Sequence, residues 1–586
     1  MKYRVTARRV YWRWLGEVEL AGGPTLRMSG DAARWLRQGD EVNLRLRGGV
    51  GGGVLEGDEY ALDCAGRVCW PLFSHEVRHV RSGRFAKELY GYDLRIREAS
   101  AEKDYEAMAS LESYNFTRSQ RAASCWRCPD GSLLRADEKP RCQGSWGRLL
   151  ELAGSTPASR FLLLEILGKS GAKPVAYLRL DPPLPVMYRR LAGGVSAGIR
   201  EAVFPKDWFG PTLDPKALQP RGRSRGESIQ EMLDGMSVAA ARIGRLLVHP
   251  KFRSEGLGLR LLRSAVAWVQ ERAVSDGRRD KQILTVVAEV ARLHPVFEKA
   301  GFRYLWDTAS GKPLLAYPLG REAESLTKRF LQSDPYAIEH GGRLFRSRYR
   351  PVSRMKESLH FSNVDKTLAS EITADALVAE VRRVLGVFGA AQPRLERALL
   401  RNVKLRIEPG GVTLLRGSDE AAKTAILRLL WDELPDSGWV DTPPGRVEAY
   451  LPGVAEPALG DEPILQRAAR RLKDSAAAVE VLCRMGLADA MLWRMAAEQL
   501  SAGDQERFRL ALMLAARPQL LLLGDFAAHL SDAAARRLAR SLAFFARQAG
   551  ITLVVSSKRK GAWLGLEPDK VIHVNHGAIR TEKTRR

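Results

Sequence analysis

The chain has 586 residues, 45% of them hydrophobic and 27% charged, which is typical of globular domains. At roughly 100–200 residues per domain, this length predicts about three or four domains. The sequence has no apolar run long enough to span a membrane and no signal-peptide region after Met1, so we expect a cytoplasmic protein with no membrane partner. The net charge of +25 favours RNA as a partner, although an incidental basic surface would carry the same charge.

Residues 1–92 are predicted to form a small β-rich module. Residues 3–7 and 41–46 alternate between apolar and polar side chains, the period of a half-buried strand. The glycine-rich run 48–53 predicts a flexible turn.

Three cysteines in the next part of the chain have spacing typical of a zinc site. Cys125 and Cys128 are separated by two residues, and Cys142 follows. These three are the candidate metal ligands, with no evident fourth. Disulfides or ordinary buried thiols are the alternatives.

Residues 93–320 are predicted to form the second domain. A strand is expected over residues 92–97 and a helix over 101–114, with Ser100 as its N-cap. The arginine- and glycine-rich stretch 221–226 is either a solvated loop or an arm that follows a phosphate backbone.

A strand, a glycine loop and a helix follow one another in this domain. The apolar strand covers residues 241–248, the loop 253–258 contains Gly256 and Gly258, and a helix opens at Leu259. Glycines let the backbone approach an anion closely, and the free N–H groups of a helix N-terminus point at it. The pattern predicts a pyrophosphate cradle.

This loop resembles the R-x-x-G-x-G motif of the GNAT acetyltransferases, and residues 294–302 resemble a later helix of that family. The resemblance implies an α/β GNAT domain that transfers acetyl from acetyl-CoA to an amine. It implies Glu289 as a general base and His294 in CoA contact or proton transfer, although a solvated carboxylate and a capping histidine are the alternatives. Phe297 stands where many members have a tyrosine general acid. The acetyl-CoA contacts implied by the resemblance are Leu246, Leu247, Val248, Arg253, Ser254, Glu255, Gly256, Leu257, Gly258, Leu259 and Phe297.

Within that family, residues 242–250 look most like the tRNA cytidine acetyltransferases. That likeness implies a base amine of tRNA or rRNA as the acceptor. Two alternatives remain open: a protein or polyamine N-acetyltransferase, and a non-enzymatic factor that associates with ribosomes or nucleic acid.

Residues 321–395 are predicted to be a basic connector. Its stretch 343–350 mixes arginines with aromatic residues, as a surface that contacts phosphates and stacks on bases would. An exposed edge strand would show the same pattern.

Residues 396–586 alternate apolar strands with amphipathic helices, which predicts an α/β sheet. Residues 400–410 resemble the opening of an ABC-type ATPase domain, 417–424 its P-loop, 500–504 its signature and 520–526 its Walker B segment. The resemblance implies binding of ATP with Mg²⁺ and a homodimer. The nucleotide-site residues that it implies are Gly417, Ala422, Lys423, Thr424, Ser501, Gly503, Asp525 and Ser557.

This site departs from the family pattern at several positions. Ala422 replaces the glycine before the lysine, Gly524 stands where an aspartate holds Mg²⁺, and Ser557 lies near the place of the switch histidine. These changes predict a degenerate domain with doubtful ATP hydrolysis, used for RNA engagement or dimerisation. Over residues 93–586 the chain resembles archaeal-type ABC ATPases fused to a GNAT domain, an α/β multidomain fold.

Overall fold

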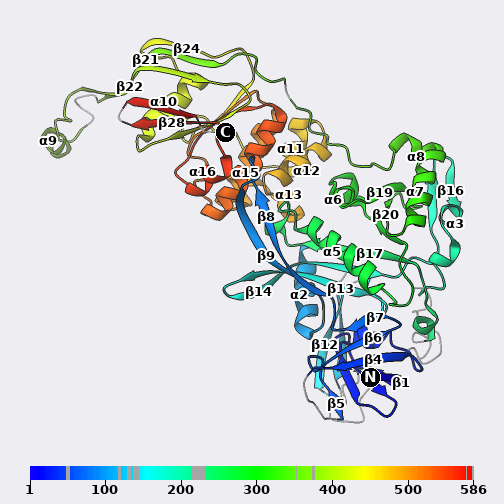
Figure 1. Ribbon diagram of the computed structural model, residues 1–586. Coiled ribbons are helices and arrows are strands. Elements are labelled where there is room, and N and C mark those ends of the chain that lie inside the picture. The colour runs from blue at the N-terminus through cyan, green and yellow to red at the C-terminus, as the bar shows by residue number, and fades with distance from the viewer. Residues whose placement is uncertain are drawn as a thin grey trace. The chain divides into compact units, whose positions relative to one another are not determined.

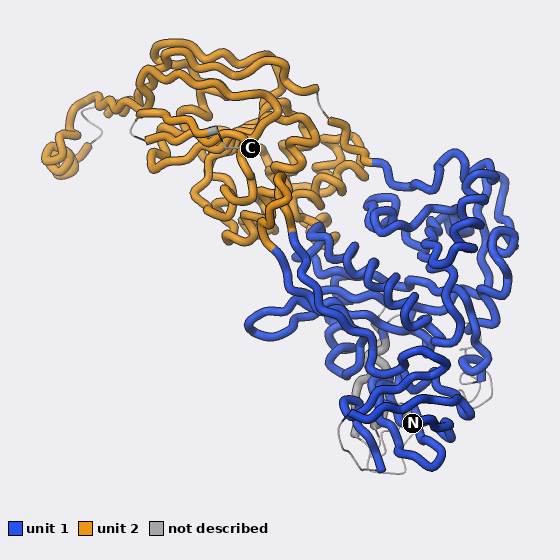
Figure 2. The backbone as a smooth tube through the Cα atoms, viewed as in Figure 1, with its two compact units in different colours: residues 1–80, 91–346 blue, residues 81–90, 347–586 orange. Residues whose placement is uncertain are grey.

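The computed structural model describes residues 1–47, 53–115, 120–127, 133–135, 145–152, 154–213, 231–351, 353–372, 377–575 and 577–583. It divides into two compact units (Figure 2). Unit 1 comprises residues 1–80 and 91–346, and unit 2 comprises residues 81–90 and 347–586. Among the described helices, none combines the length and apolar character that crossing a bilayer requires.

Unit 1 begins with a seven-stranded sheet in the order β5-β3-β2-β1-β4-β6-β7. Alternate residues of its strands are buried, as Val18 and Leu20 on β2 show, so one face covers a small apolar core. The elements are β1 Lys2–Val10, β2 Gly16–Leu20, β3 Thr25–Met28, α1 Gly30–Ala33, β4 Glu41–Leu46, β5 Val54–Leu55, β6 Tyr60–Cys64 and β7 Arg67–Trp70.

The larger sheet of unit 1 has eight strands in the order β19-β20-β18-β17-β14-β13-β9-β8 (Figure 1). Of its registered pairs, β17 with β18 is parallel and the others are antiparallel. Its strands are β8 Ser74–Ser82, β9 Glu88–Glu98, β13 Arg160–Gly168, β14 Gly171–Asp181, β17 Ala240–Val248, β18 Ile283–Val287, β19 Arg303–Asp307 and β20 Pro313–Pro318.

Both faces of this sheet are covered. Helix α5, Leu257–Arg272, packs with Leu284 and Val286 on one face, while Ile283 belongs to the core of the other face. The remaining elements of unit 1 are α2 Glu102–Glu112, η1 Ser113–Asn115, β10 Gln120–Arg127, β11 Leu133–Arg135, β12 Ser145–Leu152, β15 Tyr188–Leu191, β16 Gly194–Ala197, α3 Ile199–Val203, η2 Lys206–Trp208, η4 Pro250–Phe252, η5 Glu289–Arg292, α6 Val296–Lys299, α7 Arg321–Ser333 and α8 Pro335–His340.

Helix α2 begins later than the sequence predicted. Ala101, rather than Ser100, is its N-cap residue. The carboxylate of Asp104 accepts hydrogen bonds from the backbone N–H groups of Ser100 and Ala101, at 2.8 and 3.0 Å. These one-sided bonds from Asp104 fix the backbone just before the helix without a serine cap.

Unit 2 is built on a six-stranded sheet in the order β25-β26-β27-β23-β28-β29. Its first five strands run parallel, and β29 is antiparallel to β28. The parallel strands are buried on both faces, as the fully covered Leu520–Leu523 shows, because helices flank the sheet. Its strands are β23 Val412–Arg416, β25 Val447–Tyr450, β26 Leu520–Leu523, β27 Thr552–Ser556, β28 Lys570–Asn575 and β29 Ala578–Lys583.

A second sheet in unit 2 has the order β22-β21-β24. Its long strands β21 and β22 are joined through α9, which lies at the end of their hairpin (Figure 1). These elements are β21 Leu359–Glu371, α9 Ala379–Val387, β22 Arg394–Ile407 and β24 Ser437–Asp441. The helices of unit 2 are completed by α10 Glu420–Trp431, α11 Ile464–Leu472, α12 Ser475–Arg484, α13 Ala490–Trp493, η7 Ala497–Gln499, α14 Ala502–Ala515, α15 Asp532–Ala549 and α16 Lys560–Leu566.

The predicted basic connector, residues 321–395, contains regular structure. Helices α7 and α8 belong to unit 1, and β21 and α9 belong to unit 2. In the stretch 343–350, Tyr349 is 6% exposed and its hydroxyl donates to the backbone oxygen of Leu514, at 3.0 Å. Tyr349 is therefore a core residue of unit 2 and presents no free ring for stacking on a base.

Candidate nucleotide-binding site

The predicted nucleotide residues of unit 2 gather at one edge of its parallel sheet. Strands β23, β27 and β26 are neighbours and run in the same direction, so their carboxyl ends meet at this edge. Binding sites in such sheets lie beyond the carboxyl ends of the strands. The loop 417–424 follows β23, Asp525 follows β26, and Ser557 follows β27.

Gly417 makes the turn out of β23 and has a φ of +137°. A Cβ atom at this position would lie 2.0 Å from the backbone oxygen of Val574. Only glycine combines this backbone angle with so close an approach. The next turn is closed by Asp419, whose carboxylate accepts a hydrogen bond from the N–H of Ala422 at 3.0 Å and so caps α10.

Lys423 lies in the first turn of α10 and is 2% exposed. Its Nζ donates to the backbone oxygen of Gly417 at 2.8 Å and to Oε1 of Glu420 at 2.7 Å. The ammonium group is thus held inside the loop that a P-loop protein wraps around phosphate. Thr424, the next residue, is half-buried.

Asp525 stands directly beyond β26 with a φ of +47°. Its N–H donates to Oγ of Ser556 at 3.2 Å, and its carboxylate lies 3.7 Å from Nζ of Lys558. Ser557 is buried, and its hydroxyl donates to the backbone oxygen of Phe526 at 2.6 Å. Ser557 therefore fixes the loop that carries Asp525, a role that sequence reasoning did not predict.

Sequence reasoning also missed Glu506, which lies on α14 and is 2% exposed. Its carboxylate accepts hydrogen bonds from the N–H groups of Ala527 and His529 in the loop after β26. Burial raises the pKa of Glu506. The sequence carries no clear local signal for this role, because Glu506 stands among other charged and polar residues of α14: Asp504, Gln505, Arg507 and Arg509.

Ser501 and Gly503 lie at the start of α14 rather than in a loop after a strand. Ser501 is the N-cap, with its Oγ 2.7 Å from a carboxylate oxygen of Asp504, and it is exposed. A Cβ atom on Gly503 would lie 2.7 Å from Leu530, a residue of the loop that follows Asp525.

The predicted acetyl-CoA residues of unit 1 surround the point where β17 and β18 separate. The two strands pair from Ala240 with Ile283 to Ile243 with Val286. Beyond that point β17 continues to Val248, still paired with β14, while β18 ends at Val287. Leu246 and Val248 are half-buried here, and Leu247 is buried against α2 and its neighbours.

The loop after β17 leads into α5. Ser254 and Gly256 both have positive φ values, of +65° and +83°, and Gly256 is the N-cap of this 16-residue helix. Nε of Arg253 donates to the backbone oxygen of Val248 at 2.9 Å. Glu255 is buried, and its backbone oxygen lies 2.9 Å from Nε2 of His79. Leu257 is buried, whereas Gly258 and Leu259 are half-buried in the first turn.

The two predicted catalytic residues of unit 1 are both exposed. Glu289 opens η5 and lies 3.2 Å from Nε of Arg292, whereas His294 follows this short helix. Phe297 is 3% exposed and packs edge-on against Phe302 in the core. Its ring supports α6.

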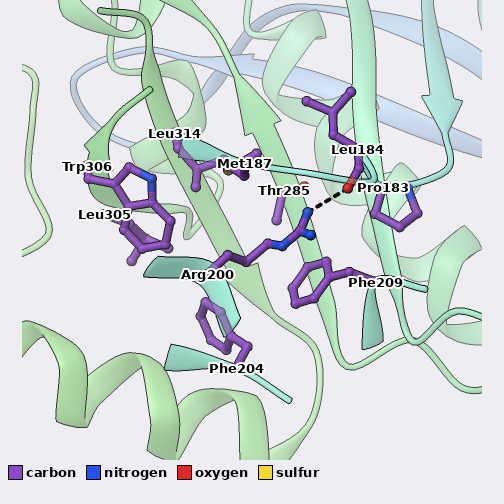
Figure 3. Close-up of a pocket in the computed structure, with 10 residues that line it drawn as sticks. All are labelled: Pro183, Leu184, Met187, Arg200, Phe204, Phe209, Thr285, Leu305, Trp306 and Leu314. Carbon is purple, nitrogen blue, oxygen red and sulfur yellow. Dashed lines mark hydrogen bonds between the residues drawn. The ribbon is translucent and has the colours of Figure 1, made fainter. Parts of the chain in front are cut away.

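A small cavity of about 10 Å³ lies on the face of the large sheet opposite α5 (Figure 3). Arg200 projects into it, but its guanidinium already donates to the backbone oxygens of Leu184 and Pro185, at 2.6 and 2.8 Å. Thr285 is bonded to the oxygen of Ala241. The residues that line the cavity include no carboxylate and no activated nucleophile. We therefore assign no catalytic function to this cavity.

Of the predicted zinc ligands, Cys128 and Cys142 lie outside the described residues, and Cys125 is described only through its backbone in β10. Stretch 221–226 and most of the glycine run 48–53 also lie outside them. Within the described part of the chain, no three histidine, cysteine or acidic side chains gather as a metal site. Zinc stays a prediction.

The parallel sheet, the glycine turn and the buried lysine define an ABC ATPase-like P-loop domain, and the comparisons with curated proteins support this class. No protein-family model matches the chain. The chain is similar to the zinc import ATP-binding protein ZnuC of Halorhodospira halophila, with 28% identity over 36% of this chain and 79% of the relative. It is also similar to the lipoprotein-releasing system ATP-binding protein LolD of Novosphingobium aromaticivorans, with 26% identity over 31% and 89%.

A third relative is the aliphatic sulfonates import ATP-binding protein SsuB of Burkholderia pseudomallei, which is 35% identical over 25% of this chain and 48% of the relative. Among solved structures, the dimeric bacterial ABC transporter cassette MJ0796 matches 39% of this chain and 99% of its own length, with 18% identity and a TM-score of 0.30.

These comparisons correct the predicted enzyme class, which was an acetyltransferase with doubtful ATP hydrolysis. The relatives reported above are named as ATP-binding proteins of import and release systems, and none of them is named as an acetyltransferase. The prediction was wrong because a glycine loop before a helix indicates only that backbone amides can bind an anion. Many nucleotide-binding proteins of other classes contain such a loop. The prediction also gave too much weight to single replacements such as Ala422 and Gly524.

Proposed function

We propose that this chain binds Mg²⁺ with ATP at the P-loop edge of unit 2 and hydrolyses it. The observation that carries the proposal is the buried ammonium of Lys423, which points back to the oxygen of Gly417 inside the loop between β23 and α10. A buried lysine in a strand–loop–helix turn is placed to meet phosphate together with the backbone N–H groups of the helix start.

The residues of this edge would have different roles in binding and hydrolysis. Lys423 and the backbone of residues 417–424 would bind phosphate, and the hydroxyl of Thr424 would reach Mg²⁺. Asp525, at the end of β26, is the carboxylate placed to orient the attacking water. Glu506 holds the loop that carries Asp525 by accepting its backbone N–H groups.

We also propose that two copies of the chain close on the nucleotide, with the signature segment of one copy facing the P-loop of the other. Ser501 is exposed at the start of a 14-residue helix, where the positive end of the helix dipole favours phosphate, and its hydroxyl would exchange the Asp504 carboxylate for a phosphate oxygen. One similar cassette of known structure is described as dimeric, which is consistent with this pairing.

Calorimetric titration with Mg·ATP, followed by measurement of phosphate release, tests this function. Wild-type protein is expected to bind and hydrolyse ATP, Lys423→Ala to lose binding, and Asp525→Asn to bind ATP without turning it over. Equal binding of Mg·ATP by wild type and Lys423→Ala would show that the nucleotide site does not lie at the P-loop edge of unit 2.

As a second function, unit 1 is proposed to bind acetyl-CoA, a binding role without a transfer reaction. The specific observation is the separation of β17 from β18: their parallel pairing runs as far as Ile243 with Val286, and β17 then continues to Val248 in pairing with β14. The start of α5 adjoins this gap, as a pyrophosphate would require. A Gly256→Val variant, strained at φ +83°, is expected to lose acetyl-CoA binding in calorimetry, whereas Lys423→Ala keeps it.

A further inference from the structure

The P-loop of unit 2 contains its own anion. Glu420 lies three residues before Lys423 on α10, and its carboxylate is 2.7 Å from the lysine Nζ. The lysine side chain is only 3% exposed, whereas that of the glutamate is 43% exposed. The buried partner is fixed in place and the acidic partner reaches it from the solvent side.

A buried ammonium needs an anion at all times, because an unpaired buried charge is strongly destabilising. In the structure, the carboxylate of Glu420 is this anion and the carbonyl of Gly417 is a second, neutral acceptor. The ammonium has a third N–H donor, but a phosphate that takes it meets the like charge of the Glu420 carboxylate, so close phosphate binding favours release of one of the two acceptors. The carbonyl belongs to a glycine whose backbone is fixed against Val574, so the half-exposed carboxylate is the group that can leave.

Asp419 does not share this role. Its carboxylate caps α10 by accepting the N–H of Ala422, and it lies 3.9 Å from Nη2 of Arg397. Its charge is bound to the loop whether or not phosphate is present. Glu420 alone is both paired with Lys423 and free to rotate towards solvent.

We propose that Glu420 is a built-in competitor of nucleotide phosphate at Lys423, which occupies the phosphate position in the empty protein and lowers nucleotide affinity. The proposal rests on the proposed ATP site in unit 2. Glu420 regulates that site in a simple way, because its carboxylate stays paired with Lys423 until a ligand with more negative charge replaces it.

The test is calorimetric titration of the full-length chain with Mg·ATP for wild type, Glu420→Gln and a matched control. Glu433→Gln removes the same charge from unit 2 at a glutamate that lies 3.1 Å from Nζ of Lys366. Glu420→Gln is expected to lower the Kd about two- to fivefold, the size expected when a partly exposed ion pair no longer competes. Glu433→Gln is expected to leave the Kd unchanged.

A second readout separates competition from a loss of structure. Without nucleotide, Glu420→Gln is expected to unfold at a lower temperature than wild type, because Lys423 loses its anion, and Mg·ATP is expected to raise the unfolding temperature more than in wild type. Glu420→Asp, with its shorter side chain, is expected to fall between the two.

The outcomes are distinct. Binding by wild type with an equal or weaker affinity in Glu420→Gln would overturn the role of Glu420 while leaving the ATP site intact. An equal gain in Glu420→Gln and Glu433→Gln would assign the effect to overall charge and would also overturn it. Absence of binding by wild type and all variants would reject the proposed function itself.

Discussion

At the scale of single residues, two carboxylates, one partly exposed and one buried, serve opposite purposes around the P-loop edge. The carboxylate of Glu420 meets a buried cation, whereas that of Glu506 meets only backbone N–H groups. Glu506 therefore remains poorly solvated without a counter-charge, and burial raises its pKa. It joins the signature helix α14 to the loop that carries Asp525.

The raised pKa of Glu506 predicts a pH dependence. The folded state holds the proton more tightly than the unfolded chain, so this contribution to stability is fully present below the unfolded pKa of about 4.3 and is lost as pH rises through the folded pKa. Thermal unfolding of wild type and Glu506→Gln between pH 4 and pH 8 measures it. As pH rises, the unfolding temperature of wild type is expected to fall relative to that of the variant. Parallel curves of unfolding temperature against pH would contradict a raised pKa for Glu506.

Removal of the Glu506 side chain has a separate cost. Glu506→Ala would leave the N–H groups of Ala527 and His529 without an acceptor, at about 1–3 kcal/mol for each buried group. We expect a marked fall in unfolding temperature together with loss of ATP turnover, because the loop carrying Asp525 is released. Turnover that survives in a folded variant would show that the clamp has no part in the site.

At the scale of elements, α10 and α14 both begin with a side-chain cap, Asp419 and Ser501, and both starts face a proposed phosphate. Ser501→Ala is expected to cost about 1 kcal/mol of stability through loss of the cap. It is also expected to lower ATP turnover more than this loss explains.

Helix α12 provides the control, because its cap Asp474 accepts two backbone N–H groups, at 2.8 and 3.0 Å. Asp474→Ala is expected to lose similar stability and keep its turnover. If phosphate-release assays show equal turnover in the two variants, Ser501 is only a helix cap.

Strand–loop–helix turns were the parts that the sequence predicted best. The apolar run at 520–523 and the glycine at 417 have strong local signals, and the structure places the run in β26 and the glycine in the turn directly after β23. Stretch 343–350 was harder, because an alternation of arginine with aromatic residues does not reveal which rings are buried. Tyr349 proved to be a core residue because α12 and α14 supply its partners, Glu480 and Leu514, and such distant contacts leave no local pattern.

At the scale of the whole molecule, the net charge of +25 still predicts RNA as a partner, now without the stacking surface first expected around Tyr349. The exposed arginines of that stretch, such as Arg346 and Arg350, remain available for phosphate contacts. Replacing both with alanine is expected to weaken RNA binding across sequences and to reduce the slope of log K against log salt by about 1 per arginine. Filter binding at several salt concentrations measures this slope. An unchanged slope would show that the stretch 343–350 does not contact RNA phosphates.

ATP hydrolysis by the intact chain is the central claim, and phosphate release measured over a range of protein concentrations tests it most directly. The account predicts Mg²⁺-dependent release whose rate per chain rises with protein concentration, because two copies close on the nucleotide, and which is lost in Asp525→Asn and Lys423→Ala. Release that persists in both variants, or its absence from wild-type protein that binds ATP, would contradict the account.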